Sequence, residues 1–355
     1  MRNYLILLLA SILFLNCSSD SETTDNIPTE PLYFPPISGT TWETKPINEL
    51  GWNDNQVQPL LNFLEEKHTK GFIILVNGRI VMEHYFNGHN ANLPWYWASA
   101  GKTLTTATIG IAEEEGLLNI NDKVSDYLGT GWTSSPLSKE NLITNKHLLS
   151  MTSGLDDSVG NGNTPADLQY IADAGTRWAY HNVFEKLQDV IAEATNQSFD
   201  AYFTTKLKNK IGMTGGWFES DEFNVYWSTT RSAARFGLLS LNKGRWNTEV
   251  IVPEEFMLAA TSTSQSLNNA YGYLWWLNGK ANYRLPQTQL LFSGSLIPSA
   301  PNDMYCALGK NDQKIYVIPS KKMVVVRLGE VADGENFALS DFDDQLWQKI
   351  NAVIN

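Results

Sequence analysis

Strand-like segments lie at both ends of this chain, and helix-like segments lie between them. Near the start, GFIILVNGRIVMEHYFN places β-type runs on either side of Asn77-Gly78, a dipeptide that favours a tight hairpin because both residues tolerate positive φ. Strand composition returns late in the chain, at 271–277, 304–309, 313–318 and 323–328. We therefore expect an α+β fold: an antiparallel sheet formed by both chain ends and flanked by helices, with an inserted, mainly helical lobe at about residues 120–265.

Helical periodicity and capping residues mark much of the intervening chain. Thr144 fits the N-cap of a short helix, and Thr164-Pro165 would open another, with proline at the first helical position. The other expected helices cover 54–67, 99–115, 183–195, 198–209, 229–244 and 339–353.

The amino-terminal residues indicate export rather than fold. Arg2 precedes an apolar run at residues 4–15, which is too short to span a bilayer, and the run ends near Cys17. This arrangement resembles a bacterial lipoprotein signal, in which Cys17 carries the lipid; the alternative is an ordinary secretory signal with an incidental cysteine. We therefore expect a lipoprotein signal segment at 1–17 and an exported protein, anchored in the membrane and facing the periplasm or the cell surface.

Residues 18–45 are rich in Ser, Thr, Asp and Pro, a composition that cannot bury a core. We expect them to form a flexible tether between the anchor and a folded body at 46–355. If Cys17 is lipidated, Cys306 has no partner cysteine, because the chain has only two, and no intramolecular disulfide is expected.

Composition and missing motifs also argue against several classes of ligand and one class of enzyme. The formal net charge of −12 and the lack of a run rich in Lys and Arg argue against nucleic acid as a partner. The sequence has no His-Glu-x-x-His motif and no pair of closely spaced cysteines, so neither a metal site nor a cofactor is expected. A Gly-x-Ser-x-Gly motif is also missing, which disfavours an α/β-hydrolase.

Ser99 and Lys102 form the first chemical pattern. On a helix, side chains three residues apart share a face, so the amine of Lys102 can reach the Ser99 hydroxyl and act as its base. The amine must then be neutral, and burial behind Trp95 and Trp97 would lower its pKa. The spacing alone is weak evidence, because Ser240 and Lys243 repeat it at the end of an expected helix, where a lysine stabilises the terminal carbonyl groups.

Tyr180 and Asn182 form the second pattern. A phenol near Ser99 and Lys102 can share their proton, and an amide side chain can hold a substrate carbonyl. The alternative is a buried structural tyrosine, and the spacing also occurs at Tyr85-Phe86-Asn87. The residues by themselves leave both interpretations open.

The order of these motifs resembles a family: the serine hydrolases related to class C β-lactamases and penicillin-binding proteins, including esterases and 6-aminohexanoate-dimer hydrolases. The resemblance covers about residues 50–350 and rests on ASAGKTLT, YHN, LLSMTSGL, ARFGLLSLNKGRWN and YGYLWWLN. It implies the β-lactamase/transpeptidase-like fold, with Ser99 as nucleophile, Lys102 as its base and Tyr180 as proton shuttle.

The family's third motif ends in a glycine, and its nearest match here is Lys310-Asn311-Asp312, in a short hairpin. By this resemblance Asn182, Lys310 and Asn311 are expected to bind substrate. Because the third motif departs from the family pattern, we expect a small-molecule ester or amide, or a peptide, as substrate, with an esterase or small-amide hydrolase favoured. The alternatives are a β-lactamase, a D-Ala-D-Ala carboxypeptidase and a weakly catalytic penicillin-binding sensor.

Overall fold

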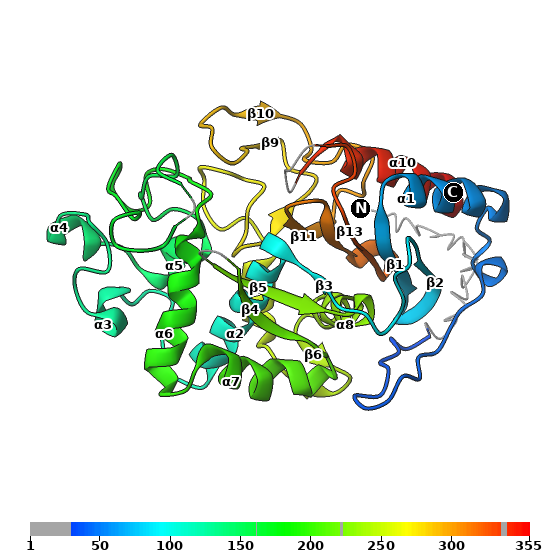
Figure 1. The fold of residues 1–355 in the computed structure, drawn as a ribbon, viewed down its shortest axis with the longest axis horizontal. Coiled ribbons are helices and arrows are strands. Elements are labelled where there is room, and N and C mark those ends of the chain that lie inside the picture. The colour runs from blue at the N-terminus through cyan, green and yellow to red at the C-terminus, as the bar shows by residue number, and fades with distance from the viewer. Residues whose placement is uncertain (1–29, 161, 221–222, 335–338) are drawn as a thin grey trace, which may run out of the picture. The chain divides into compact units, whose positions relative to one another are not determined.

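A six-stranded antiparallel sheet takes its strands from both ends of the chain (Figure 1). The spatial order is β2-β1-β13-β12-β11-β8, and β1 pairs with β13 so that Ile74 lies opposite Val325. This pairing confirms the expected α+β fold class. The strands are β1 Thr69–Val76, β2 Arg79–Tyr85, β8 Trp276–Leu277, β11 Tyr305–Gly309, β12 Gln313–Ile318 and β13 Met323–Gly329.

The computed structural model describes residues 30–160, 162–220, 223–334 and 339–355. The expected signal segment with Cys17, and the first part of the tether, lie outside these residues. The tether boundary at residue 45 needs correction, because the chain from Leu32 onward belongs to the folded unit. Trp42 is buried, and Thr44 forms a bridge to Ile80 of β2.

Helices cover the two faces of the sheet (Figure 1). On one face, α1 (Val57–Glu66) packs against α10 (Asp341–Ile354). On the other face, α8 (Thr230–Leu241) approaches β12 and β13 so closely that a Cβ atom on Gly237 would lie 2.5 Å from a Val324 methyl group. The glycine therefore lets this helix lie against the sheet.

The middle of the chain is mainly helical, and α3 to α6 lie on the opposite side of Figure 1 from α1 and α10. The helix α2 is buried on every side from residue 102 to residue 112, because it runs through the interior instead of along a surface. The helices of this region are α2 Lys102–Glu114, α3 Ser125–Leu128, α4 Leu137–Glu140, α5 Asn145–Leu149, α6 Lys186–Thr195, α7 Phe199–Phe203 and α9 Glu254–Ala260.

The prediction of a helix after Thr164-Pro165 was wrong. The backbone N–H of Leu168 does bond to the Thr164 carbonyl, but the chain then leaves the helical path. The N–H groups of Ile171 and Ala172 bond to the Gly154 carbonyl instead. Pairing with a distant segment therefore replaces the helical hydrogen bonds.

The strand expected at 271–277 is also much shorter than predicted. Only Trp276 and Leu277 pair with β11, because the chain folds back on itself just before them. In this turn the N–H of Gly272 bonds to the Trp275 carbonyl, and Leu274 has a φ of 60°. The aromatic composition was typical of a strand, but it belongs to a tight turn.

A three-stranded sheet of order β3-β5-β4 was not predicted from the sequence. Its strands are β3 Trp95–Tyr96, β4 Gly216–Ser220 and β5 Phe223–Ser228. Two further pairs are β6 Arg245–Trp246 with β7 Glu249–Val250, and β9 Asn282–Tyr283 with β10 Phe292–Ser293. None of the helices in the described part of the chain is long and apolar enough to cross a membrane.

Candidate active site

The Ser99 turn is fixed by the small sheet that precedes it. After β3, the buried Trp97 donates its backbone N–H to the Tyr226 carbonyl at 2.8 Å and its indole N–H to Ser228 at 2.8 Å. Ala98 then has a φ of 46°, an uncommon value for a residue with a side chain. The chain reverses there, and Ser99 lies in the short 3₁₀ turn Ala98–Gly101 that leads into α2.

Lys102 is the first residue of α2, and its side chain returns toward Ser99. Its Nζ lies 2.9 Å from Ser99 Oγ, although only 4% of the lysine is exposed to solvent. The ring of Phe184 lies 4.1 Å from Nζ and excludes water from it. Burial lowers the pKa of the Lys102 amine well below its usual value, and the nearby Glu185 carboxylate opposes part of this shift. A buried, partly neutral amine in contact with a hydroxyl is the arrangement that a serine nucleophile needs.

Tyr180 belongs to the same cluster. Burial raises the pKa of Tyr180 to about 12, and a hydrogen bond between its hydroxyl and Ser99 opposes the rise. At neutral pH the phenol therefore keeps its proton, so it can pass one proton on while receiving another. The ring of Tyr180 lies 5.1 Å from Lys102 Nζ, so all three predicted catalytic side chains meet.

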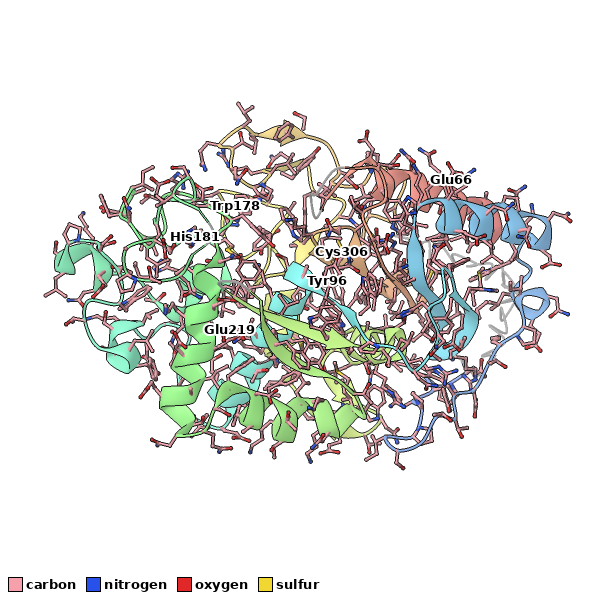
Figure 2. All side chains as sticks on the ribbon, viewed as in Figure 1. Glu66, Tyr96, Trp178, His181, Glu219 and Cys306 are labelled. Atoms are coloured by element: carbon pink, nitrogen blue, oxygen red, sulfur yellow. The ribbon has the colours of Figure 1, made fainter. Side chains whose placement is uncertain are left out.

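Three buried aromatic residues hold the Tyr180 ring. Trp276 stacks on it with ring centroids 5.8 Å apart, and Trp178 and Tyr271 contact it at 6.3 and 6.2 Å. Figure 2 labels Trp178 beside His181, in the segment that leads into α6. His181 has a structural contact, because its Nδ1 accepts the backbone N–H of Val183 at 3.0 Å.

Asn182, predicted to bind substrate, lies in the same cluster. Its Oδ1 accepts a hydrogen bond from Lys102 Nζ at 3.4 Å. Asn182 begins the 3₁₀ turn Asn182–Glu185, so Glu185 follows it by one turn on the same side of the chain.

Glu185 is a charged residue that the sequence analysis missed. Its buried carboxylate accepts the backbone N–H of Asn224 at 2.9 Å and a hydrogen bond from the Asn163 side chain. Burial raises the pKa of this carboxyl group, and the positive charge of Lys102 opposes the rise. The signal that could have revealed it is its spacing of three residues from Asn182.

The third predicted motif lies in the hairpin between β11 and β12. Lys310 is exposed there, and the structure shows no contact in the described residues between its side chain and Ser99, Lys102 or Tyr180. Asn311 donates its side-chain N–H to the Tyr96 hydroxyl at 2.8 Å. Asp312 is buried away from the cluster, where it accepts hydrogen bonds from Ser340 at 2.8 Å and from the Ala332 N–H at 3.1 Å.

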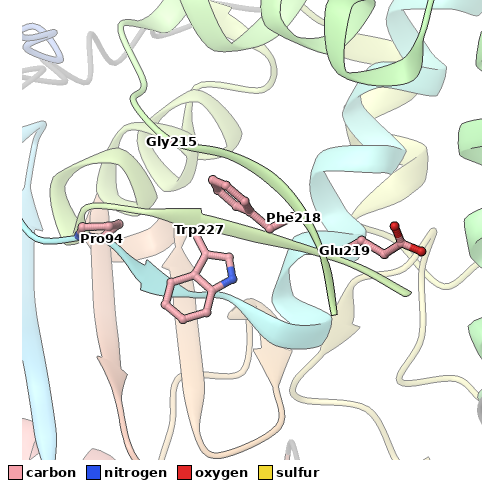
Figure 3. A pocket seen from close by; sticks show the side chains of 5 residues that line it. All are labelled: Pro94, Gly215, Phe218, Glu219 and Trp227. Carbon is pink, nitrogen blue, oxygen red and sulfur yellow. The ribbon is translucent and has the colours of Figure 1, made fainter. Parts of the chain in front are cut away.

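A separate hollow of about 470 Å³ lies on the three-stranded sheet (Figure 3). Its lining residues are Pro94, Gly215, Phe218, Glu219 and Trp227, and they do not include the residues of the Ser99 cluster. The described residues contain no group of three or more His, Cys, Asp or Glu side chains that could hold a metal ion.

The fold and the Ser99 motif are those of a serine hydrolase. Residues 62–344 match the family model described as Beta-lactamase, so the chain belongs to the β-lactamase family. This family assignment confirms the resemblance inferred from the sequence, and its members are serine hydrolases related to β-lactamases and penicillin-binding proteins.

Individual proteins match this chain over only part of its length or at low sequence identity. PbpX of Bacillus subtilis (strain 168), named as a penicillin-binding protein, is 30% identical over 189 residues, which cover 48% of this chain and 46% of PbpX. The match therefore spans less than half the length of that relative.

Two solved structures share the fold at low sequence identity. One, from Bacillus anthracis, is named as a 6-aminohexanoate-dimer hydrolase and has a TM-score of 0.69 at 20% identity, covering 90% of this chain and 89% of its own. The other, EstCE1, described as a hydrolase with promiscuous acyltransferase activity, has a TM-score of 0.63 at 13% identity, covering 87% and 99%. At these identities the comparison establishes the fold alone.

Proposed function

We propose that this protein hydrolyses an ester or amide bond through an acyl intermediate on Ser99. The observation that carries the proposal is the contact of Ser99 Oγ with the buried Lys102 amine at 2.9 Å, with the ring of Tyr180 5.1 Å from the same amine. A serine hydroxyl is a weak nucleophile until a base takes its proton. Here a buried amine contacts the hydroxyl, and a phenol that can carry a proton lies beside the same amine.

Acylation then uses all three side chains. Ser99 Oγ attacks the substrate carbonyl carbon, its proton passes to the neutral Lys102 Nζ, and the carbonyl electron pair moves onto oxygen. The backbone N–H of Ser99, near the amino end of α2, is suited to stabilise that negative charge. When the intermediate collapses, the bond to the leaving group breaks, and the alcohol or amine takes its proton from the Lys102–Tyr180 pair.

Deacylation repeats the steps with water. A water molecule attacks the acyl carbonyl, and the Lys102–Tyr180 pair accepts its proton. The bond to Ser99 Oγ then breaks, the oxygen regains a proton from the same pair, and the acid product leaves. The raised pKa of Tyr180 keeps the phenol protonated at the start of each cycle.

The third motif supports an ester or a small amide as substrate over a β-lactam. Asp312 occupies the position of the family glycine and is buried against Ser340 and Ala332. Asn311, the middle residue, is bound to Tyr96 and is not free to hold a substrate carboxylate. Neutral acyl groups therefore fit this hairpin better than substrates that must anchor a carboxylate.

A panel of three substrates tests this preference. We expect p-nitrophenyl acetate to be hydrolysed with a higher kcat/KM than nitrocefin or a D-Ala-D-Ala peptide, because it needs no carboxylate anchor. The measurement is initial rate against substrate concentration for each compound at one pH. Nitrocefin turnover faster than ester turnover would contradict the preference and leave the acyl-serine mechanism intact.

The similarity to PbpX favours a second function, that of a penicillin-binding sensor that acylates but barely hydrolyses. Such a protein would keep the acyl group on Ser99 after reaction with a penicillin. Intact-mass spectrometry over time distinguishes the two functions, since a sensor retains the added mass and a hydrolase loses it.

We also propose that the protein is an exported lipoprotein whose anchor is attached at Cys17. The proposal rests on the apolar run that ends just before this cysteine. Replacing Cys17 by alanine is expected to abolish incorporation of a labelled fatty acid and to move the protein out of the membrane fraction. Unchanged fatty-acid labelling of the Cys17→Ala variant would contradict the anchor.

A further inference from the structure

The hairpin between β11 and β12 lies directly against the Ser99 turn. A Cβ atom on Gly309, the last residue of β11, would lie 2.3 Å from the Trp97 carbonyl oxygen and 3.1 Å from the Ala100 nitrogen. The edge strand β8 pairs with β11 only at Tyr305 and Cys306, so the register with β8 ends before Gly309. The end of β11 therefore lies against the turn that carries Ser99.

The hairpin loop is a tight turn. Asn311 and Asp312 have φ angles of 60° and 61°, the pair of left-handed values typical of a two-residue hairpin turn, which asparagine and aspartate tolerate. The turn's backbone and side chains are bound from both sides of the loop.

Arg327 of β13 holds the loop from one side. It is fully buried, and its guanidinium donates to the carbonyl oxygens of Asn311 at 3.1 Å and Asp312 at 3.0 Å. The remaining donors bond to Thr69 Oγ1 at 3.2 Å, the Lys67 carbonyl at 2.6 Å and the Glu330 carbonyl at 2.8 Å. All five N–H groups of the planar fork are thus used, and a lysine could not reproduce them.

Tyr96 holds the loop from the other side. Its hydroxyl accepts the Asn311 side-chain N–H at 2.8 Å, and it lies three residues before Ser99 in the chain. Tyr96 therefore connects the loop to the strand that positions the nucleophile. In Figure 2, Tyr96 is labelled on the β3 segment.

From this geometry we propose that Arg327 and Tyr96 are positioning residues for the reaction at Ser99. They fix the backbone of residues 309–311 beside Ser99, where its N–H groups face the oxyanion that forms on the substrate. Because the oxyanion exists only in the transition state and the tetrahedral intermediate, the two residues act on kcat more than on KM. The proposal rests on the proposed function of Ser99.

The first test is Tyr96→Phe, which removes only the hydroxyl that holds Asn311. Removing an oxyanion donor outright costs about 10²–10³-fold in kcat, so a displaced donor is expected to cost about 10-fold. We expect kcat for p-nitrophenyl acetate to fall by that factor with KM unchanged. The affinity for a phenylboronic acid, which mimics the tetrahedral intermediate, is expected to fall in parallel.

Tyr85→Phe is the matched control. The Tyr85 hydroxyl donates to Glu83 at 2.6 Å on β2, at the edge of the sheet farthest from β11. This variant loses the same atom and one hydrogen bond, and we expect kcat and boronate affinity to stay at the wild-type values. A general effect of losing a tyrosine hydroxyl would instead lower both variants alike.

Arg327→Lys is the stronger variant, and its melting temperature shows whether it folds. If it is folded, we expect a larger loss of kcat than in Tyr96→Phe, with an infrared shift of the acyl carbonyl band to higher frequency as its hydrogen bonds weaken. If it is unfolded, Tyr96→Phe decides the question alone. A folded Tyr96→Phe protein with wild-type kcat and boronate affinity would overturn the positioning role, whereas a wild-type protein that is not acylated at Ser99 would overturn the proposed function instead.

Discussion

Replacing Ser99 by alanine is expected to abolish turnover and covalent labelling by a fluorophosphonate or penicillin probe. The substitution removes the oxygen that contacts Lys102 Nζ, and no other described hydroxyl contacts that amine. Loss of a serine nucleophile lowers kcat by about 10⁴–10⁶-fold, since only binding and charge stabilisation remain. Gel fluorescence with the probe and the rate of ester hydrolysis measure the two effects.

The chain provides a matched control in Ser240→Ala. Ser240 also stands three residues before a lysine, but Lys243 forms an exposed ion pair with Glu254 at 3.0 Å. Its Nζ is engaged by Glu254, and the Ser240 hydroxyl has no hydrogen-bond partner among the described residues. The Ser240→Ala variant is therefore expected to label and hydrolyse like the wild type. Undiminished labelling of Ser99→Ala, in contrast, would end the acyl-serine mechanism.

The comparison of these two serines shows what local sequence can and cannot predict. The spacing is identical, so local sequence predicts the same approach of the two side chains for both pairs. What differs is burial: Lys102 lies beneath Phe184, and Lys243 lies in solvent. Burial depends on segments far away in the chain, which is why the spacing needed the Tyr180 motif and the family resemblance beside it.

The sheet could be predicted from the sequence because its strands are continuous and apolar. The run MVVVRL and the Asn77-Gly78 turn each carry a strong local signal, and pairing the two ends follows from their order. The small sheet was missed because β3 has only two residues and β4 and β5 carry mixed composition. The pairing of β3 with β5 nevertheless sets where Trp97 and Ser99 lie.

Glu185 and Arg327 were missed for a related reason. Apart from its spacing of three residues from Asn182, Glu185 has no local signal that distinguishes it from a solvated helix residue, and its carboxylate is bound by the distant Asn224 and Asn163. The role of Arg327 depends on carbonyl groups of Asn311 and Asp312, which lie on another strand connection. Arg327 is a charged residue within the apolar run MVVVRL, so the sequence could have predicted that it has buried hydrogen-bond partners.

The pH dependence of activity follows from the charge state of Lys102. Its amine must be neutral to accept the Ser99 proton, and burial lowers its pKa below the usual value. Activity is therefore expected to be present above the lowered pKa and to be lost as the pH falls through it, because the amine becomes protonated. The pKa of Tyr180, about 12, places the loss of the phenol proton far on the alkaline side. A profile of kcat/KM against pH is expected to show an acidic limb and a broad plateau above it.

Replacing Lys102 by methionine is expected to lower kcat/KM by about 10²–10⁴-fold, the usual contribution of a general base, and to remove the acidic limb from any residual activity.

The same substitution is not expected to lower the stability of the folded protein. In the pH range between the lowered folded pKa and the ordinary unfolded pKa, the unfolded chain binds more protons at Lys102 than the folded protein does. The lysine therefore destabilises the folded state increasingly as the pH falls through that range, and methionine, an apolar side chain of similar length, removes this cost. We expect the Lys102→Met variant to melt at no lower temperature than the wild type at neutral pH, while Lys243→Met, the control on the exposed lysine, keeps full activity. A Lys102→Met enzyme with kcat/KM near that of the wild type would show that another group takes the Ser99 proton.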